Sequence, residues 1–537
     1  TTYGEEIEAD VAMRVIADHS RAAAFLIADG IMPSNEERGY VLRRIMRRAI
    51  RYGVKLGLKE PFLYKTAQAV VEQMGEAYPE LQERKDFIEE IIRGEEDRFS
   101  ETLDKGLQLL EGAIAKSDGT LKGDVVFKLY DTYGFPLDLT RLIAEEREVL
   151  LDEKGYHQAM EAQRAAGRAA WKGSGEEAKI DVDGSLNPST FNGYDNNSFS
   201  SSVSNLFQEG QAATRLDQGQ KGILVVEHTP FYAEAGGQVG DKGVIRGPQG
   251  IFTVHDVQKG KGGASLHIGT IREGHIQQGD TVNLEVDAAR RDRIRLNHTA
   301  THLLHSALKN VLGAHVTQKG SLVDAERLRF DFSHHKPMSP KEVDAVERLV
   351  YQQVLENTAI GTDLMDLEAA VEAGATALFG EKYDDDVRVV SMGAFSKELC
   401  GGTHAHATGD IGLFKITSEA GVAAGVRRIE ALTGNGAFQW LSHLTQTATD
   451  ASRKLKSSVN DLPDALDKLL ADRKKLEKEL DSLRRQLASE ASGSLLDSVR
   501  QINGINVLSA ELPGDAGTLR DQADSLRSKL GSGIVVL

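Results

Sequence analysis

The sequence feature that most restricts the fold is a pair of short motifs, each carrying two candidate metal ligands. His298 and His302 begin and end the run HTATH, and Cys400 and His404 begin and end the run CGGTH. In a helix this spacing of four residues is about one turn, so both imidazoles of the first pair project from one face. In the second pair, two glycines let the backbone turn tightly between the ligands. Either pair alone is suggestive, and the two together strongly indicate a metal site.

The donor set of these motifs is three imidazoles and one thiolate. This borderline-soft, tetrahedral set favours Zn²⁺ over Mg²⁺ or Ca²⁺, and we predict one zinc ion per chain. Four protein ligands close the tetrahedron, as in a structural zinc site, whereas a catalytic zinc needs an open position. The sequence leaves both alternatives open. His305 and His406 lie near the motifs, and we expect them to serve packing or hydrogen bonding rather than to act as a fifth ligand.

Composition sets the remaining limits. The chain has 537 residues, 40% of them hydrophobic and 27% charged, which is typical of a soluble globular protein with several domains. It has no run of eighteen apolar residues that could span a membrane. A single cysteine excludes an internal disulfide framework and fits a reducing cytosol, so we predict a cytoplasmic protein. The first residues lack an initiator Met and the last stop inside a predicted strand, so we expect both ends to be cut.

The net charge of −17 argues against a protein that coats nucleic acid by bulk attraction. A local basic track remains compatible with that charge, because the Debye length at cellular salt is only about 8 Å. One predicted helix carries a stripe of guanidinium groups that is the best candidate for contact with a phosphate backbone. Its members are Arg43, Arg44, Arg47, Arg48 and Arg51. The alternative is a solvated or salt-bridged helix face.

Periodicity and composition predict a multi-domain α+β chain. Residues 1–175 show the apolar spacing of helices, whereas short apolar runs between glycines in 221–290 indicate strands. The run at 196–202, rich in Ser and Asn, is typical of a loop. The predicted units are 1–175 helical, 176–220 linker and start of a β-barrel, 221–290 β-barrel, 291–440 mixed α/β with the metal motifs, 441–495 coiled coil, and 496–537 a truncated α/β unit.

Leucines between 462 and 487 alternate in steps of four and three, except that Arg473 stands at one position where the pattern requires a leucine. With Lys and Glu at the other positions, this pattern indicates a coiled coil or an antiparallel helical hairpin. We expect the segment to act as a spacer or an association device, and a homodimer through the C-terminal region is one possibility.

The two metal motifs resemble the paired zinc motifs of alanyl-tRNA synthetase editing domains. Free-standing alanyl-tRNA editing proteins share these motifs, and the threonyl-tRNA synthetase editing domain is a relative. The run TPFYAEAGGQVGD at 229–241 is similar to the glycine-rich loop on the small barrel beside that site, with Gly236, Gly237, Gln238 and Gly240. The runs at 35–44 and 129–136 resemble the helical tRNA-recognition domain of alanyl-tRNA synthetase. The leucine-rich segment and the tail fit that family's C-terminal region.

The resemblance implies roles for particular residues. Thr301 and Gln318 match positions in the editing pocket, where a hydroxyl and an amide can hydrogen-bond the hydroxyl of serine. Without the family, Thr301 is better interpreted as a helix residue bonded to its own backbone, and Gln318 as a surface residue. Asn35 and Asp131 match family residues that read the acceptor-stem G·U pair, which an amide and a carboxylate can meet in the wide minor groove of RNA. The alternative interpretations are that Asn35 marks the start of a helix and that Asp131 caps a turn.

Aminoacyl transfer in this family uses a class II core whose last signature is a glycine-rich stretch ending in arginine. We find no such stretch here, and no G-x-x-x-x-G-K-[ST] phosphate loop. We therefore expect a fragment that lacks the N-terminal core, so that ATP and Mg²⁺ belong only to the missing part. The full-length parent would attach alanine to tRNA(Ala) with ATP.

The predicted activity of this chain is hydrolysis of mischarged Ser-tRNA(Ala) and Gly-tRNA(Ala). Editing is needed because an alanine pocket rejects neither the smaller glycine nor the hydroxyl of serine strongly. Two rival functions remain. One is a tRNA-binding module with a structural zinc, and the other is a coiled-coil fragment that mediates dimerisation.

Overall fold

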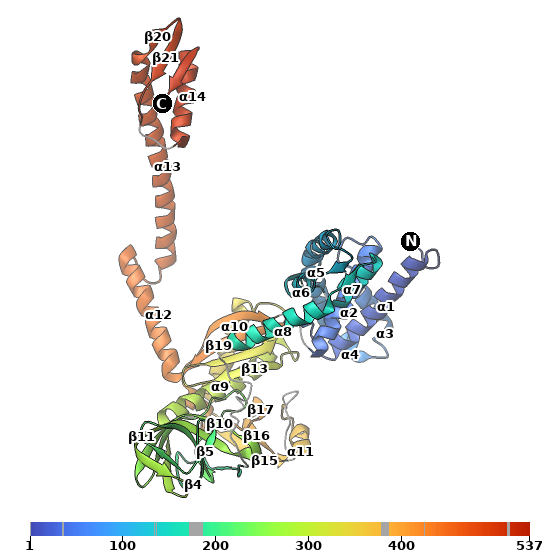
Figure 1. Cartoon of the computed structure of the whole chain (residues 1–537), viewed down its shortest axis with the longest axis vertical. Coiled ribbons are helices and arrows are strands. Elements are labelled where there is room, and N and C mark those ends of the chain that lie inside the picture. Colours follow the sequence, from blue (N-terminus) through green and yellow to red (C-terminus); the bar gives the residue numbers. More distant parts are fainter. Residues whose placement is uncertain are drawn as a thin grey trace. The chain divides into compact units, whose positions relative to one another are not determined.

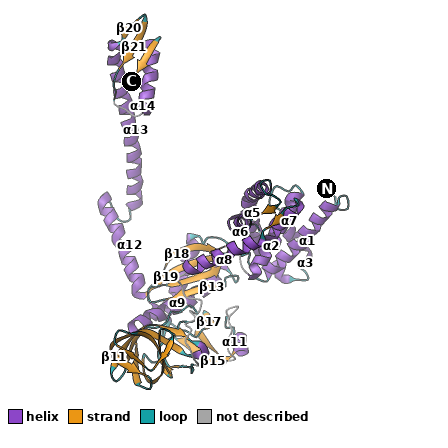
Figure 2. Cartoon of the chain, in the orientation of Figure 1, coloured by secondary structure: helices purple, strands orange, loops and turns teal. Residues whose placement is uncertain are grey.

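The computed structural model describes residues 2–34, 37–133, 135, 137–170, 186–376, 386–423, 425–512 and 516–537. The chain divides into two compact units, Thr1–Phe438 and Gln439–Leu537. In Figure 2, most strands of the first unit gather in its barrel and in the sheets beside the long helix α9 (Ala288–Leu312), whereas the N-terminal part is almost entirely helical.

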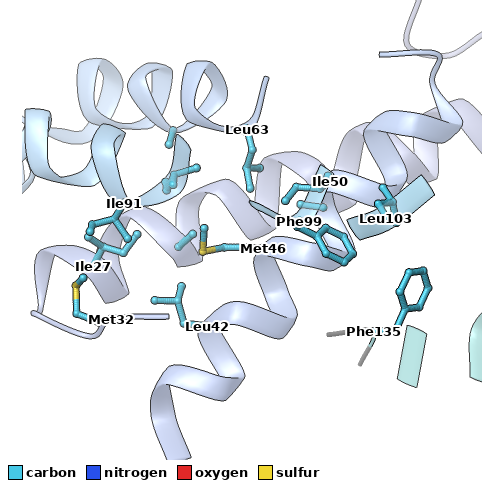
Figure 3. Packing of buried hydrophobic residues seen from close by; sticks show 14 of the residues in the cluster. Ile27, Met32, Leu42, Met46, Ile50, Leu63, Ile91, Phe99, Leu103 and Phe135 are labelled. Atoms are coloured by element: carbon cyan, nitrogen blue, oxygen red, sulfur yellow. The ribbon is translucent and has the colours of Figure 1, made fainter. Parts of the chain in front are cut away.

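The N-terminal part is built on helices that share one apolar core. Its helices are α1 (Ile7–Ala28), α2 (Glu37–Lys55), α3 (Leu63–Met74), α4 (Pro79–Glu83), α5 (Lys85–Ile114), α6 (Gly123–Tyr133), α7 (Leu137–Glu146) and α8 (Glu153–Ala170). The short strands β1 (Thr120–Leu121) and β2 (Leu150–Leu151) pair in parallel. Figure 3 shows the core, where Ile27, Met46, Leu63 and Phe99 are fully buried among their neighbours.

A closed β-barrel follows. Its strands and the short pieces beside it are β3 (Thr190–Phe191), β4 (Ser198–Gln208), β5 (Gln211–Ala213), β6 (Arg215–Asp217), β7 (Lys221–Val226), β8 (His228–Thr229), β9 (Gly243–Arg246), β10 (Gly250–Lys259), β11 (Ser265–Gln277) and β12 (Thr281–Val286). Six of them pair in the order β10-β9-β12-β4-β7-β11, and β11 pairs with β10 to close the ring. Closure leaves these strands without an open edge at the seam.

The expectation of a loop at 196–202 is wrong for most of that run, because β4 begins at Ser198. β4 is paired on both sides, by β12 and by β7. Further along β4, Val203 and Leu206 are buried in the barrel core. Ladder hydrogen bonds and these inward side chains outweigh the weak strand preference of serine and asparagine.

The rest of the first unit places two sheets beside helix α9. One sheet has the order β13-β14-β19-β18 and the other β15-β16-β17. The elements are β13 (Gln318–Val323), β14 (Leu328–Ser333), α10 (Pro340–Glu356), β15 (Ile360–Asp366), α11 (Leu367–Glu372), β16 (Asp386–Met392), β17 (Ser396–Leu399), β18 (Phe414–Ala423) and β19 (Val426–Thr433). Leu304 and Leu308 of α9 pack with Phe330 and Ile429 of the first sheet in one core. This packing fixes the helix that carries the HTATH motif.

The second unit contains most of α12 (Gly434–Leu455), then α13 (Leu462–Leu495), and ends in a small α/β unit. That end comprises β20 (Arg500–Ile502), β21 (Ile505–Ser509), α14 (Ala516–Leu530) and β22 (Gly533–Val536). α13 is one continuous helix, drawn in orange-red in Figure 1, so the hairpin alternative for the leucine-rich segment is wrong. Its leucines at 466, 469, 476, 480 and 483 are exposed. A coiled-coil partner for them stays a prediction.

Among the described residues, none of the helices combines the length and the hydropathy that crossing a membrane requires.

Candidate metal centre

Helix α9 presents His298 and His302 from one face, as their spacing predicts. The two imidazole rings stack with their centroids 5.2 Å apart. The helix begins after Asp287, whose carboxylate accepts from the amide of Arg290 and so caps the first turn. Both histidines are buried, so their ring nitrogens need partners inside the protein.

The loop after β17 carries Cys400 and His404 to these rings. Gly402 is required for this approach, because a Cβ at that position would lie 2.1 Å from Cε1 of His298. Arg388 on β16 donates to the carbonyls of Cys400 and Gly402, at 2.9 and 3.0 Å. The hydroxyl of Tyr194 donates to the carbonyl of Gly401, and the Arg388 guanidinium lies 4.2 Å from the centre of the Tyr194 ring. The loop is therefore held in place by its backbone, which leaves the ligand side chains free to turn inward.

The two motifs meet in one cluster of four potential ligands. One ligand atom of each of His298, His302, Cys400 and His404 lies within 4.8 Å of all the others. The sulfur of Cys400 is 3.5 Å from Nε2 of His298 and 3.3 Å from Nε2 of His404. In a tetrahedral zinc site, the bond lengths place a sulfur and a nitrogen ligand about 3.5 Å apart. The spacing of this donor set therefore fits a bound zinc ion.

Polar partners orient the three histidine rings through Nδ1. Nδ1 of His298 lies 2.8 Å from Oε1 of Gln238, and Nδ1 of His302 lies 2.7 Å from Oε2 of Glu398. Nδ1 of His404 lies 3.3 Å from the hydroxyl of Thr299. A proton on Nδ1 leaves Nε2 as the lone-pair donor, the arrangement that metal-ligating histidines need. Nε2 of His302 is buried with no hydrogen-bond partner, an orphan that a metal ion would satisfy.

Gln238 and Glu398 each join more than one part of the centre. Oε1 of Gln238 also accepts from the amide of Thr403, and its Nε2 donates to the Thr403 hydroxyl. The second oxygen of Glu398 lies 2.8 Å from Nδ1 of His305. His305 thus shares a carboxylate with a ligand and is absent from the four-ligand cluster, in agreement with the hydrogen-bonding role expected for it.

The charges in the centre favour a cation. Burial raises the pKa of Cys400, but the neighbouring His298 and His404 outweigh it and hold that pKa well below its ordinary value. Burial lowers the pKa of His302, but Glu398 and Cys400 outweigh it and raise that pKa to about 10, so the metal-free ring holds a second proton that a metal at Nε2 would displace. Two anionic groups, a thiolate and a carboxylate, therefore face the imidazoles, and a thiolate is the form of cysteine that binds metals.

The glycine-rich loop at 229–241 lies against this centre through Gln238. Gly236 and Gly237 have φ of 58° and 83°, which favours glycine, and a Cβ on Gly237 would meet the carbonyl oxygen of Ser321 at 2.7 Å. Arg291 of α9 is fully buried and donates to the Asp241 carboxylate at the end of the loop. The loop is thus fastened to the helix that carries His298 and His302.

The structure gives the predicted pocket residues definite places. Thr301 is buried on α9, and its hydroxyl donates to the carbonyl of Asn297 at 2.8 Å. Gln318 begins β13 and is partly exposed. These positions leave the editing roles of both residues as predictions.

The arginine stripe on α2 divides into two kinds of side chain. Arg47 and Arg51 are buried, and Arg43 is partly buried. Arg43 and Arg47 both donate to Glu95 of α5, at 2.8 and 2.9 Å, so this part of the stripe is salt-bridged. The exposed members are Arg44 and Arg48. Contact of the stripe with tRNA stays a prediction, and these two residues are its best-placed members.

Of the two residues expected to read the G·U pair, the structure describes only one. Asn35 lies outside the described residues. Asp131 is exposed on α6, and its Oδ1 accepts from Nε2 of Gln163 at 2.8 Å. Its role in tRNA recognition stays a prediction.

Fold and site together define a class of protein with several α and β domains, in which a His₃Cys centre joins a helix to a loop beside a small barrel. The family model for tRNA synthetases class II (A) matches residues 1–290, more than half of the 537 residues, and the chain belongs to this family. A second model, the threonyl and alanyl tRNA synthetase second additional domain, matches residues 387–430. The second match contains Glu398, Cys400 and His404.

These matches indicate an enzyme of the alanyl or threonyl type that acts on tRNA. They also correct one expectation. The absence of a class II part from this chain conflicts with a class II match that begins at residue 1. That expectation rested on the absence of two short glycine-rich signatures, and the absence of a few residues is weaker evidence than a match along 290 residues.

Proposed function

We propose that this chain is an editing hydrolase that cleaves the ester bond of Ser-tRNA(Ala) and Gly-tRNA(Ala). The observation that carries the proposal is the convergence of three imidazoles, each with Nδ1 beside a polar partner, on the thiolate of Cys400. The family makes tRNA the partner, and the second additional domain supplies Cys400 and His404. A bound Zn²⁺ would polarise the ester carbonyl or lower the pKa of a water molecule.

The protein's own side chains would provide the selectivity for serine. The Thr301 hydroxyl donates to the backbone of Asn297, so its oxygen retains lone pairs that can accept a hydrogen bond from the serine hydroxyl. The amide of Gln318 would donate to the same hydroxyl. Alanine lacks this group, so correctly charged Ala-tRNA makes neither contact. A site that pairs with a substrate hydroxyl discriminates strongly against an analogue without it.

tRNA would be held by the helical part. The exposed Arg44 and Arg48 of α2 can contact phosphates, whereas Asp131, and Asn35 by resemblance, would read the acceptor stem. A buried salt bridge at Arg43 and Arg47 keeps α2 against α5, so that the exposed arginines are presented from a fixed helix.

One observation favours a second function. Four protein ligands complete the tetrahedron of a zinc ion, which is typical of structural sites. A tRNA-binding module with a structural zinc would then carry out no hydrolysis. The rate of serine release from Ser-tRNA(Ala), compared with alanine release from Ala-tRNA(Ala), separates the two. Faster release of serine supports the hydrolase, and a folded, zinc-loaded chain that releases neither amino acid is a binding module.

A further inference from the structure

A second group of three histidines lies in the same unit, away from the HTATH and CGGTH motifs in the sequence. His315 lies in the loop between α9 and β13, and His334 and His335 directly follow β14. One ring nitrogen of each lies within 4.8 Å of the other two. Nε2 of His315 and Nδ1 of His334 are 3.0 Å apart. Two nitrogen ligands of a tetrahedral zinc ion stand about 3.3 Å apart, as the bond length implies.

The backbone that carries this group is cross-linked by Ser333. The Ser333 hydroxyl donates to the carbonyl of His315 at 2.7 Å and accepts from the amide of Thr317 at 2.8 Å. The two loops are therefore tied to each other beside the rings. Such support is what a preformed ligand set requires.

Helix α5 closes the group from the other side and brings a carboxylate. Oε1 of Glu90 lies 3.1 Å from Nε2 of His335. The ring of Phe87 lies 4.8 Å from that of His315, centre to centre, and covers it with an apolar surface. Arg98 donates to the carbonyl of His335, so α5 and the loop are in direct contact. Three imidazoles therefore converge from two loops, and the Glu90 carboxylate adjoins one of them, His335.

Three ring nitrogens in the group are buried without a hydrogen-bond partner. They are Nε2 of His334 and both Nδ1 and Nε2 of His335. A buried polar atom without a partner costs about 1–3 kcal/mol, so such orphans point to a bound group that satisfies the cluster. The contact between His315 and Nδ1 of His334 provides for none of these atoms. Nε2 of His335, which faces Glu90, is the one that a metal ligated there would satisfy.

We propose that His315, His334 and His335, with Glu90 as a fourth ligand, form a second site for a divalent transition metal. Imidazole and carboxylate donors suit Zn²⁺, Co²⁺ or Ni²⁺. Burial lowers the pKa of both His315 and His334 to about 4, so these rings are neutral at physiological pH and offer lone pairs. The site would fasten α5 of the helical part to the loops that precede β13 and follow β14, at the open end of that hairpin.

Cobalt distinguishes the two sites, because only the site at Cys400 contains sulfur. The metal-stripped full chain is titrated with Co²⁺ by equilibrium dialysis, and the absorption spectrum is recorded at each step. Two equivalents are expected, one with a thiolate-to-cobalt charge-transfer band in the near ultraviolet and one without it. A wild-type chain that binds a single equivalent would overturn the proposal, and this result depends on no variant.

Variants assign the second equivalent. A chain with His334→Ala and His335→Ala should keep one equivalent, the one with the charge-transfer band. A chain with Cys400→Ser and His404→Ala should keep the equivalent without that band. His255→Ala, an exposed histidine on β10, should keep both. If the folded His334→Ala, His335→Ala chain still bound two equivalents of Co²⁺, these residues would be excluded as metal ligands.

Glu90 has a matched control in Lys336, whose ammonium contacts the same carboxylate. Glu90→Gln should weaken the second equivalent about tenfold or more. Lys336→Gln should leave it unchanged or tighten it, because the ammonium competes with a metal for Glu90. Equal weakening by both changes would show that the ion pair, rather than metal ligation, is what matters.

Discussion

Oε2 of Glu398 lies 2.7 Å from Nδ1 of His302, and this contact determines which nitrogen of the ring is available as a ligand. Glu398 stands on β17, two residues before Cys400, and its other oxygen meets Nδ1 of His305 at 2.8 Å. One buried carboxylate therefore orients two histidines on successive turns of α9. The orphaned Nε2 of His302 is the direct consequence.

Glu398→Gln should weaken zinc binding by about 10–100-fold, the usual cost of losing a group that orients a ligand. His302 and His305 contact different oxygens of Glu398, so an amide at this position would turn its NH₂ group towards one of them. Competition with a chromogenic chelator measures the affinity, and Glu372→Gln on the exposed end of α11 is the control. Unchanged affinity in a folded Glu398→Gln chain would show that the carboxylate does not orient His302.

Gln238→Ala should also weaken zinc binding, by about tenfold or more, because His298 loses the acceptor for its Nδ1 proton. Gln238→Glu keeps an acceptor oxygen at this position and should restore most of the affinity. The exposed Gln277→Ala serves as the control. The same chelator competition applies, and equal affinity losses in the Ala and Glu variants would contradict a role in fixing the tautomer.

Gln318→Ala should slow hydrolysis of Ser-tRNA(Ala) about fivefold, which corresponds to about 1 kcal/mol for one lost hydrogen bond. Hydrolysis of Gly-tRNA(Ala) and the zinc content should not change, because glycine has no hydroxyl to bond. Lys319→Ala, at the exposed neighbouring position, is the matched control. Single-turnover deacylation measures both rates, and an unchanged rate with Ser-tRNA would remove Gln318 from the mechanism.

The arginines of α2 should separate into two classes. Arg44→Ala with Arg48→Ala should weaken tRNA binding and reduce its salt dependence by about one unit of slope per lost phosphate contact. Arg47→Ala should instead lower the free energy of unfolding by about 3 kcal/mol, because it removes a buried partner of Glu95. Binding at several salt concentrations and urea unfolding are the measurements. Loss of tRNA affinity only with Arg47→Ala would reverse the assignment.

The exposed leucines of α13 predict self-association. Leu476 and Leu480 are 63% and 49% exposed and lie one helical turn apart, so they form part of an apolar strip that a partner helix would cover. Leu476→Lys with Leu480→Lys should shift a concentration-dependent dimer towards monomer by at least tenfold in Kd. Sedimentation equilibrium measures the mass. A wild-type chain that stays monomeric at high concentration would exclude this function of α13.

The cluster of four candidate ligands could be predicted from the sequence, because helix spacing and a lone cysteine mark its members. The groups that orient them could not. Gln238 is 60 residues from His298 and Glu398 is 96 residues from His302, so only the tertiary fold brings these pairs together. Gln238 was predicted as part of the glycine-rich loop, but nothing local marks it as a partner of His298.

Burial was the other property that local patterns could not provide. The helical period of α2 predicts one basic face, but Glu95 lies 48 residues from Arg47 and draws part of that face into the interior. Likewise, the composition of 196–202 favours a loop, and the pairing of β4 with strands from elsewhere in the chain makes most of it a strand. In both cases distant partners outweigh local preference.

The most direct test of the editing function is the metal dependence of Ser-tRNA(Ala) deacylation by the full chain. Hydrolysis should be lost when zinc is stripped by a chelator, return with Zn²⁺ but not with Mg²⁺, and spare Ala-tRNA(Ala) throughout. Hydrolysis at the full rate by a metal-free chain, or none by a folded chain that holds zinc at Cys400, would contradict a zinc-dependent editing enzyme.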